Sequence, residues 1–177
     1  MSDTTPSVQT ALDKMKTWIA AYPGYSILED FQVDYTDKIP ANGGIFPSGL
    51  VEVARKQDIF GVVTVTNQYN FGLYYVFTKA PGDDAGATVN ADWVIDFQEW
   101  VQSQSALGEA PIFGDDTTRE KISAQNGVLY EANDEGTATY MVQLSVQFIK
   151  RYEKYEWPYI ENHNPDFDFL DDPFSIH

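Results

Sequence analysis

The feature that most constrains the fold is a long alternation of apolar and polar side chains between Val63 and Thr78. Successive side chains of a β-strand point to opposite faces, so this period of two predicts a strand. At about 3.3 Å per residue such a strand would span roughly 50 Å, well beyond a typical strand of about five or six residues. We therefore expect part of it to extend into a hairpin arm or to pair with a neighbouring subunit. The alternative is a bulge or break near Gly72.

Shorter alternations predict four more strands, within residues 26–35, 50–54, 122–130 and 138–148. Two prolines and three glycines make residues 37–49 a predicted loop, and a hairpin turn is expected at residues 55–58. Residues 133–136, Asn-Asp-Glu-Gly, carry a strong turn signal between the last two strands. Because hairpins dominate, the sheet is predicted to be mainly antiparallel.

Two helices are predicted from apolar residues that recur every three or four positions. Thr5 is the expected N-cap of the first, Pro6 its first residue, and its apolar face runs from Val8 to Tyr22. Asn90 is the expected N-cap of the second, whose core-facing side carries Trp93, Val94, Phe97, Trp100 and Val101. The predicted order is α-β-β-β-α-β-β, an α+β fold with about five strands and both helices packed on one face of the sheet.

The chain divides into a folded domain over residues 1–152 and an acidic, aromatic C-terminal arm over residues 153–177. The arm has no clear periodicity, yet it is rich in aromatic residues, which disordered segments usually lack. Either it docks, on its own domain or on a neighbour, or it is a flexible tail. Its candidate interaction residues are Tyr155, Trp157, Tyr159, Phe167 and Phe169.

The chain is strongly acidic, with 27 acidic residues, 11 basic residues and a formal net charge of −16. Binding to nucleic acid in general is therefore not expected, because Lys and Arg must neutralise the phosphates, and anionic membrane surfaces are disfavoured too. The acidity either provides ordinary solubility or repels DNA that passes through a channel. The N-terminus lacks the features of a signal peptide, and no apolar run approaches the ~18 residues of a membrane span. We expect a cytoplasmic protein.

The residues that most enzymes and metal sites require are scarce. The chain has no cysteine, and its two histidines, His163 and His177, both lie in the C-terminal arm. Residues 166–172 superficially resemble a calcium loop but lack the sixth-position glycine and the closing glutamate. The acidic pairs at 83–84 and 115–116 are interpreted as solvated turns. We predict no catalytic, cofactor-binding or metal-binding residues.

Four segments of the domain resemble a group of prophage proteins of Firmicutes. The segments are residues 46–51 (Phe-Pro-Ser-Gly-Leu-Val), 65–71 (Val-Thr-Asn-Gln-Tyr-Asn-Phe), 93–100 (Trp-Val-Ile-Asp-Phe-Gln-Glu-Trp) and 133–140 (Asn-Asp-Glu-Gly-Thr-Ala-Thr-Tyr). The resemblance covers roughly residues 8–152. Proteins of this group belong to head–tail connection and tail modules, and some are labelled minor capsid proteins.

The predicted order of elements is also similar to that of the lambda-type phage tail terminators. That resemblance implies a virion structural protein without a cofactor, which assembles in the host cytoplasm and caps the tail tube as a hexameric ring that meets the head-completion proteins. One alternative is another phage structural role, as a minor capsid, head-closure or tube protein. The other is a small-molecule-binding domain or an enzyme with a pocket lined by Trp93 and Trp100.

Overall fold

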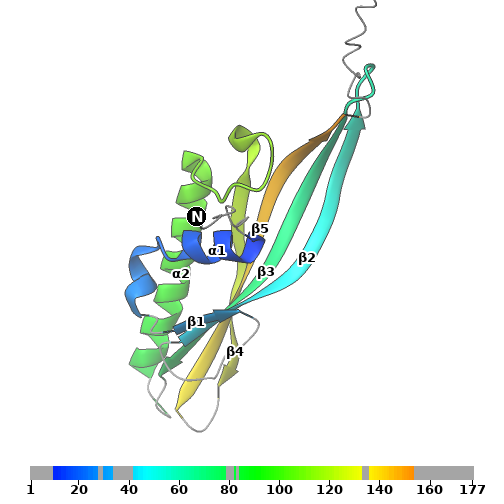
Figure 1. Cartoon of the computed structure of the whole chain (residues 1–177). Helices are drawn as coiled ribbons and strands as arrows, with labels where there is room; N and C mark the ends of the chain where they lie inside the picture. The colour runs from blue at the N-terminus through cyan, green and yellow to red at the C-terminus, as the bar shows by residue number, and fades with distance from the viewer. Residues whose placement is uncertain are drawn as a thin grey trace, which may run out of the picture.

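A five-stranded sheet, with the strand order β1-β2-β3-β5-β4, forms the framework of the fold (Figure 1). The computed structural model describes residues 10–27, 30–33, 42–78, 82, 84–132 and 136–153. The strands are β1 (Asp30–Val33), β2 (Asn42–Gln57), β3 (Val63–Thr78), β4 (Lys121–Ala132) and β5 (Thr137–Tyr152). The helices are α1 (Ala11–Ile19) and α2 (Asp84–Leu107), with short 3-10 helices at Pro23–Ile27 and Thr117–Arg119.

This arrangement confirms the predicted α+β fold and the order α-β-β-β-α-β-β. The β2–β3, β3–β5 and β5–β4 pairs are antiparallel, whereas β1 pairs with β2 in parallel. The first predicted strand is shorter than expected, because Pro23–Ile27 forms a 3-10 helix and β1 begins at Asp30. Tyr35, assigned to the same strand, lies outside the described residues.

The long strand is confirmed, and β3 is continuous over 16 residues. It pairs with β5 without a register shift, from Val63 opposite Tyr152 to Thr78 opposite Thr137. The alternative of a bulge or break in β3 near Gly72 is therefore wrong, although a bulge on the neighbouring β2 lies opposite Phe71 and Asn70. The irregularities lie on β2 instead, where the register shifts after Pro47 and again after Glu52.

The prediction of a loop over residues 37–49 is wrong from Asn42 onward, because Asn42–Gln57 forms β2. Glycine and proline lower the intrinsic preference of this segment for a strand. Pairing with β3 along the strand and with β1 over its first four residues outweighs that local effect. Pro47 lies past the last residue paired with β1 and beside a bulge, where a strand tolerates proline. Gly49, at the bulge, has φ +104°, a conformation that favours glycine.

Helix α1 begins later than predicted, because its N-cap is Thr10 rather than Thr5. The Thr10 side chain accepts a hydrogen bond from the Asp13 backbone N–H, and the Asp13 carboxylate accepts one from the Thr10 backbone in return. The hydrogen bond from the Thr10 hydroxyl lowers the pKa of Asp13. Residues 1–9 lie outside the described residues. The predicted apolar face holds, since Met15 and Ile19 are fully buried.

Helix α2 begins at Asp84, so the prediction that Asn90 caps it is wrong. Asn90 lies inside the helix and is buried, and its side-chain amide donates to the Thr78 carbonyl at 3.2 Å. A buried amide needs such a partner, and this one ties the helix to the end of β3. The sequence pattern therefore suggested a helix cap at a residue that instead holds two distant segments together.

Aromatic side chains fill the space between the helices and the sheet. The Phe97 ring lies 5.2 Å from Tyr22, 5.7 Å from Tyr75 and 5.9 Å from Trp93, measured between centroids. Burial raises the pKa of Tyr75 well above its ordinary value. Helices α1 and α2 also contact each other directly, with Trp18 and Trp100 4.5 Å apart. Both helices thus cover the same face of the sheet, as predicted.

We predict that Phe97→Ala lowers the free energy of unfolding by about 3–5 kcal/mol, because the ring is fully buried among other rings. The matched control is Ile95→Ala on the same helix, where the side chain is 52% exposed and the loss should be about 0.5 kcal/mol or less. Urea unfolding followed by tryptophan fluorescence measures both. Similar losses for the two variants would contradict the described core.

Candidate functional site

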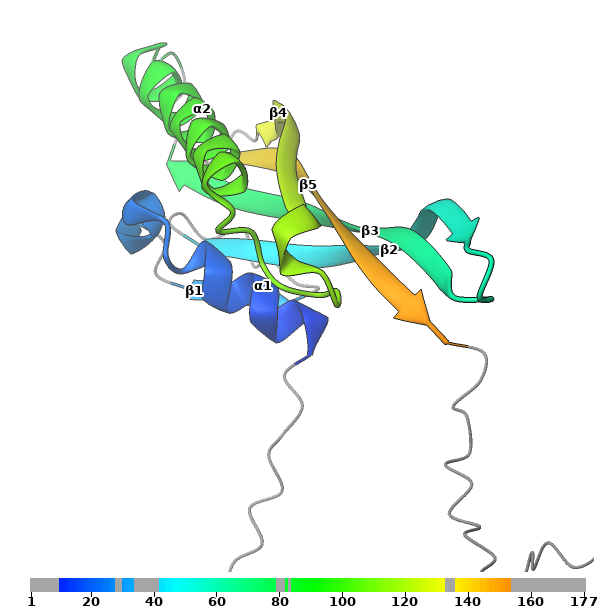
Figure 2. The ribbon, with the colours of Figure 1, turned by 90° about the horizontal axis from the view of Figure 1, so that it is seen from above.

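Strands β2, β3 and β5 continue beyond the helices as a projecting structure (Figures 1 and 2). We call residues 48–66 of the β2–β3 hairpin, together with residues 149–152 of β5, the distal arm. At its far end Gln57 pairs with Val63, and Val63 pairs with Tyr152. Every residue of β2 from Pro47 to Gln57 is exposed. Among the described residues, this length of β2 pairs with β3, and its side chains remain exposed.

The tip of the distal arm is residues 58–62, a tight turn organised by Asp58. The Asp58 carboxylate accepts hydrogen bonds from the backbone N–H groups of Phe60 and Val62, each at 2.9 Å. The prediction of a turn at residues 55–58 is wrong, because β2 continues through Gln57. The register shift after Glu52 accompanies an exposed Glu52–Arg55 ion pair at 2.7 Å, which lies within the strand.

Two large apolar side chains lie at this tip. Ile59 is 94% exposed and Phe60 is 82% exposed. Burying either side chain fully would contribute roughly 1.5–3 kcal/mol. Adjacent exposed apolar side chains at the end of a projecting hairpin are typical of a protein–protein contact.

A second surface is a groove of about 620 Å³ between α2 and β4. We call it the α2–β4 groove. Its lining residues on α2 are Ile95, Gln98, Glu99, Gln102, Ser105 and Ala106. Its lining residues on β4 are Lys121, Ile122, Ser123, Ala124 and Gln125.

Helix α2 also covers part of the backbone edge of β4. The Ser105 hydroxyl accepts a hydrogen bond from the Ile122 N–H at 3.2 Å, and the Gln98 amide donates to the Ala124 carbonyl at 3.5 Å. An uncovered edge would present these groups to another strand. Pairing with a neighbouring sheet edge is therefore disfavoured at this part of β4.

The loop after α2 supports the base of the distal arm. Glu120 is buried, and its carboxylate accepts hydrogen bonds from the N–H groups of Phe113 at 2.9 Å and Gly114 at 2.6 Å. Next, the Asp115 N–H donates to the Ile149 carbonyl at 2.8 Å, and the Asp115 carboxylate accepts from the Arg151 N–H at 2.8 Å. The loop thus occupies the outer edge of β5 where the ladder with β4 has ended.

Asp116, the other half of this acidic pair, caps the 3-10 helix at Thr117–Arg119. A hydrogen bond from the Thr118 side chain lowers the pKa of Asp116. Both acids of the pair therefore have local structural partners.

The other face of the sheet carries neutral polar side chains at its centre. Asn70 accepts hydrogen bonds from Gln68 at 2.8 Å and from Ser145 at 2.9 Å, and Gln147 donates to Gln68 at 2.9 Å. This chain of amides and a hydroxyl links the two strands that form the middle of the sheet. The centre of that face therefore carries neutral polar side chains that bond to one another, and no ionised group among the described residues.

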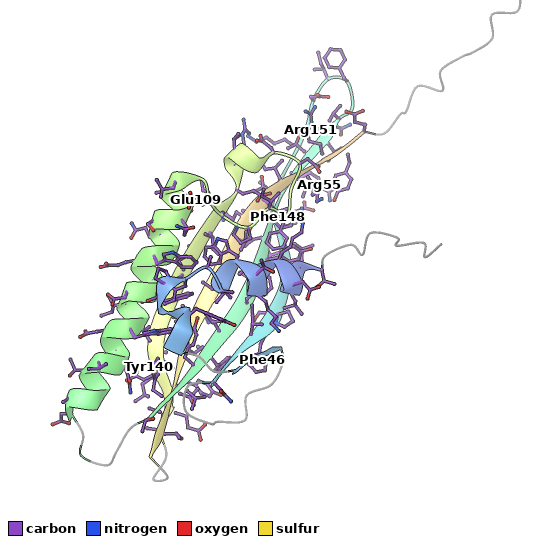
Figure 3. The ribbon with its side chains drawn as sticks, turned by 60° about the vertical axis from the view of Figure 1, so that its left-hand side comes forward. Phe46, Arg55, Glu109, Tyr140, Phe148 and Arg151 are labelled. Atoms are coloured by element: carbon purple, nitrogen blue, oxygen red, sulfur yellow. The ribbon has the colours of Figure 1, made fainter. Side chains whose placement is uncertain are left out.

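Charge is distributed unevenly between the distal arm and α2. The arm carries four basic residues (Arg55, Lys56, Lys150 and Arg151) and two acidic residues (Glu52 and Asp58), and Arg55 and Arg151 both lie on it in Figure 3. Helix α2 has the opposite character. It carries four acidic residues, Asp84, Asp92, Asp96 and Glu99, and no basic residue. The arm is thus locally basic in a chain whose net charge is −16.

Several predicted site residues lie outside the described residues: Tyr155, Trp157, Tyr159, Phe167, Phe169, both histidines and the calcium-like segment 166–172. Trp93 and Trp100, the candidates for lining a ligand pocket, instead pack against Tyr75 and Trp18 at 4.2 and 4.5 Å.

Within the described ranges no cluster of three or more His, Asp or Glu side chains could hold a metal ion. Neither described helix is long and apolar enough to cross a membrane.

Sequence reasoning missed both the apolar tip and the groove. Ile59 and Phe60 follow a run of polar residues at the end of β2, and this pairing of apolar residues at a turn could have identified the tip. No comparable signal marks the groove, because residues 95–106 and 121–125 meet only in the folded chain.

A scan against protein-family models finds no family that matches this chain, and no curated protein is significantly similar to it in sequence.

We predict that Ile59→Ser combined with Phe60→Ser leaves the free energy of unfolding within about 0.5 kcal/mol of the wild-type value, because both side chains are solvent-exposed. Urea unfolding measures this, with Phe71→Ser on the buried face of β3 as the destabilised reference. A loss above about 1 kcal/mol would mean that the tip packs against its own chain.

Proposed function

We propose that this chain is a virion structural protein of a tailed bacteriophage. Its role is that of a tail terminator, which assembles in the host cytoplasm as a ring of several copies, expected to be six. The ring caps the tail tube and joins it to the head through the head-completion proteins. The protein acts through surface contacts rather than through catalysis.

The observation that carries this proposal is the distal arm with its exposed apolar tip. A domain that acts alone gains little from extending three strands beyond its core, and Ile59 and Phe60 are exposed where nothing described covers them. Subunits of assemblies use such projections to reach their neighbours. The resemblance of four sequence segments to prophage head–tail proteins supports the same class of function.

The net charge supports the specific role in the tail. DNA passes through the ring of a tail terminator, and an acidic lumen would repel phosphate and prevent the DNA from binding. The chain's net charge of −16 is consistent with such a lumen.

We predict that the full chain forms a closed ring at high concentration, or on addition of the tail-tube protein encoded in the same phage genome. Multi-angle light scattering gives the mass, and negative-stain electron microscopy shows whether the ring is closed and sits at tube ends. The Ile59→Ser/Phe60→Ser variant is the control and should stay monomeric. Wild-type protein that remains monomeric both alone and with the tube protein would contradict the proposed function.

We also predict that deleting residues 153–177 leaves a folded domain and impairs assembly. Circular dichroism and unfolding check the fold, and light scattering checks the assembly. A full-length variant with Tyr155, Trp157, Tyr159, Phe167 and Phe169 all changed to serine separates the aromatic contribution from the acidic one. If the truncated chain fails to fold, these residues belong to the core instead.

A further inference from the structure

We infer that the tip of the distal arm of one copy docks in the α2–β4 groove of a second copy of this chain. This contact rests on the proposed function, because it supplies the subunit interface of the ring. It assigns the interface to two surfaces that lie on the same chain.

The two surfaces match in polarity. The tip offers Ile59 and Phe60, which are 94% and 82% exposed. The groove offers apolar contacts from Ile95, which is 52% exposed, and from Ala106 and Ala124, among lining residues that are otherwise mostly polar. Its volume of about 620 Å³ falls within the range of clefts, roughly 300–1,000 Å³, that enclose a drug-sized molecule, so it has room for two side chains.

The two surfaces also match in charge. Copies with a net charge of −16 repel each other, so a stable self-contact should use a region where basic side chains outnumber acidic ones. The distal arm is such a region. Arg55 pairs with Glu52 and Lys150 with Asp115, whereas Lys56 has no ion pair among the described residues and lies in β2 just before the tip.

The groove is lined by Glu99 on its α2 side and by Lys121 on its β4 side, and Asp92 and Asp96 are exposed on α2, which has no basic residue. Docking would place the basic arm along the acidic helix.

The geometry makes the contact intermolecular. The distal arm projects away from the helices (Figures 1 and 2). The groove lies elsewhere on the molecule, between α2 and the edge strand β4. One copy therefore cannot fill its own groove. Because the tip and the groove are different surfaces, their contact is head-to-tail, and repeating it generates a ring when the rotation closes.

The absence of cysteine from the chain allows a direct test. Full-length Gln57→Cys, which keeps Ile59 and Phe60 and carries a tag that changes its size, is mixed with full-length Ala106→Cys and oxidised mildly. Ala106 lines the groove and is exposed. The matched control replaces the second protein with Val89→Cys, which is 67% exposed on the same helix but outside the groove. We expect a mixed disulfide dimer from the groove pair at about tenfold the yield of the control pair.

A charge reversal in the groove tests the electrostatic part. Adding Glu99→Lys to the Ala106→Cys protein should reduce the yield of the mixed dimer several-fold. Glu131→Lys makes the same change of charge outside the groove and should leave the yield unchanged. Equal yields for the two reversals would overturn the placement of the arm along α2.

The outcomes separate this inference from the proposed function. Electron microscopy could show rings while the groove pair cross-links no better than the control pair. The interface then lies elsewhere on the chain, and the proposed function is retained. If neither cross-linking nor assembly occurs, alone or with the tube protein, both the interface and the proposed function are overturned. Cross-linking of the groove pair above the control, lost on Glu99→Lys, supports the assigned interface.

Discussion

The rest of the structure depends on the pairing of β3 along its full length. Its 16 residues would span about 50 Å, and β5 matches them residue for residue. Helix α2, with 24 residues, reaches only about 36 Å. The helical layer is therefore shorter than the sheet, and the uncovered remainder of β2, β3 and β5 becomes the distal arm. The arm follows from this difference in length, with no separate domain needed to build it.

The outer backbone edges of β4, β5 and β2 are each partly covered or irregular. Helix α2 occupies the backbone of β4 at Ile122 and Ala124, and the loop held by Glu120 occupies β5 near Ile149. Strand β1 pairs with β2 only as far as Ile45, and the following length of β2 carries two register shifts. Bulges twist an edge and discourage indiscriminate strand pairing. The structure therefore favours contact through side chains at the tip over extension of the sheet.

Charge and apolar exposure divide the molecule into two complementary regions. Helix α2 carries four acidic residues and no basic residue, whereas four basic and two acidic residues lie on the distal arm beside the exposed apolar tip. In the proposed ring, copies of this acidic chain would repel each other at long range, and local basic surface would reduce that repulsion. In the proposed ring, this distribution of charge would let the basic arm of one copy contact the acidic helix of the next.

The sequence by itself determined the order of the elements, the α+β class, the length of β3 and the apolar faces of both helices, because these depend on periodicity within one segment. It misplaced features that depend on distant partners. Residues 42–49 form a strand because β1 and β3 pair with them, and Asn90 is buried because its amide reaches Thr78. The apolar tip had a local signal, whereas the α2–β4 groove had none. Only the tertiary structure revealed the groove. Its two walls come from separate segments of the chain, and the periodicity within one segment does not show which other segment packs against it.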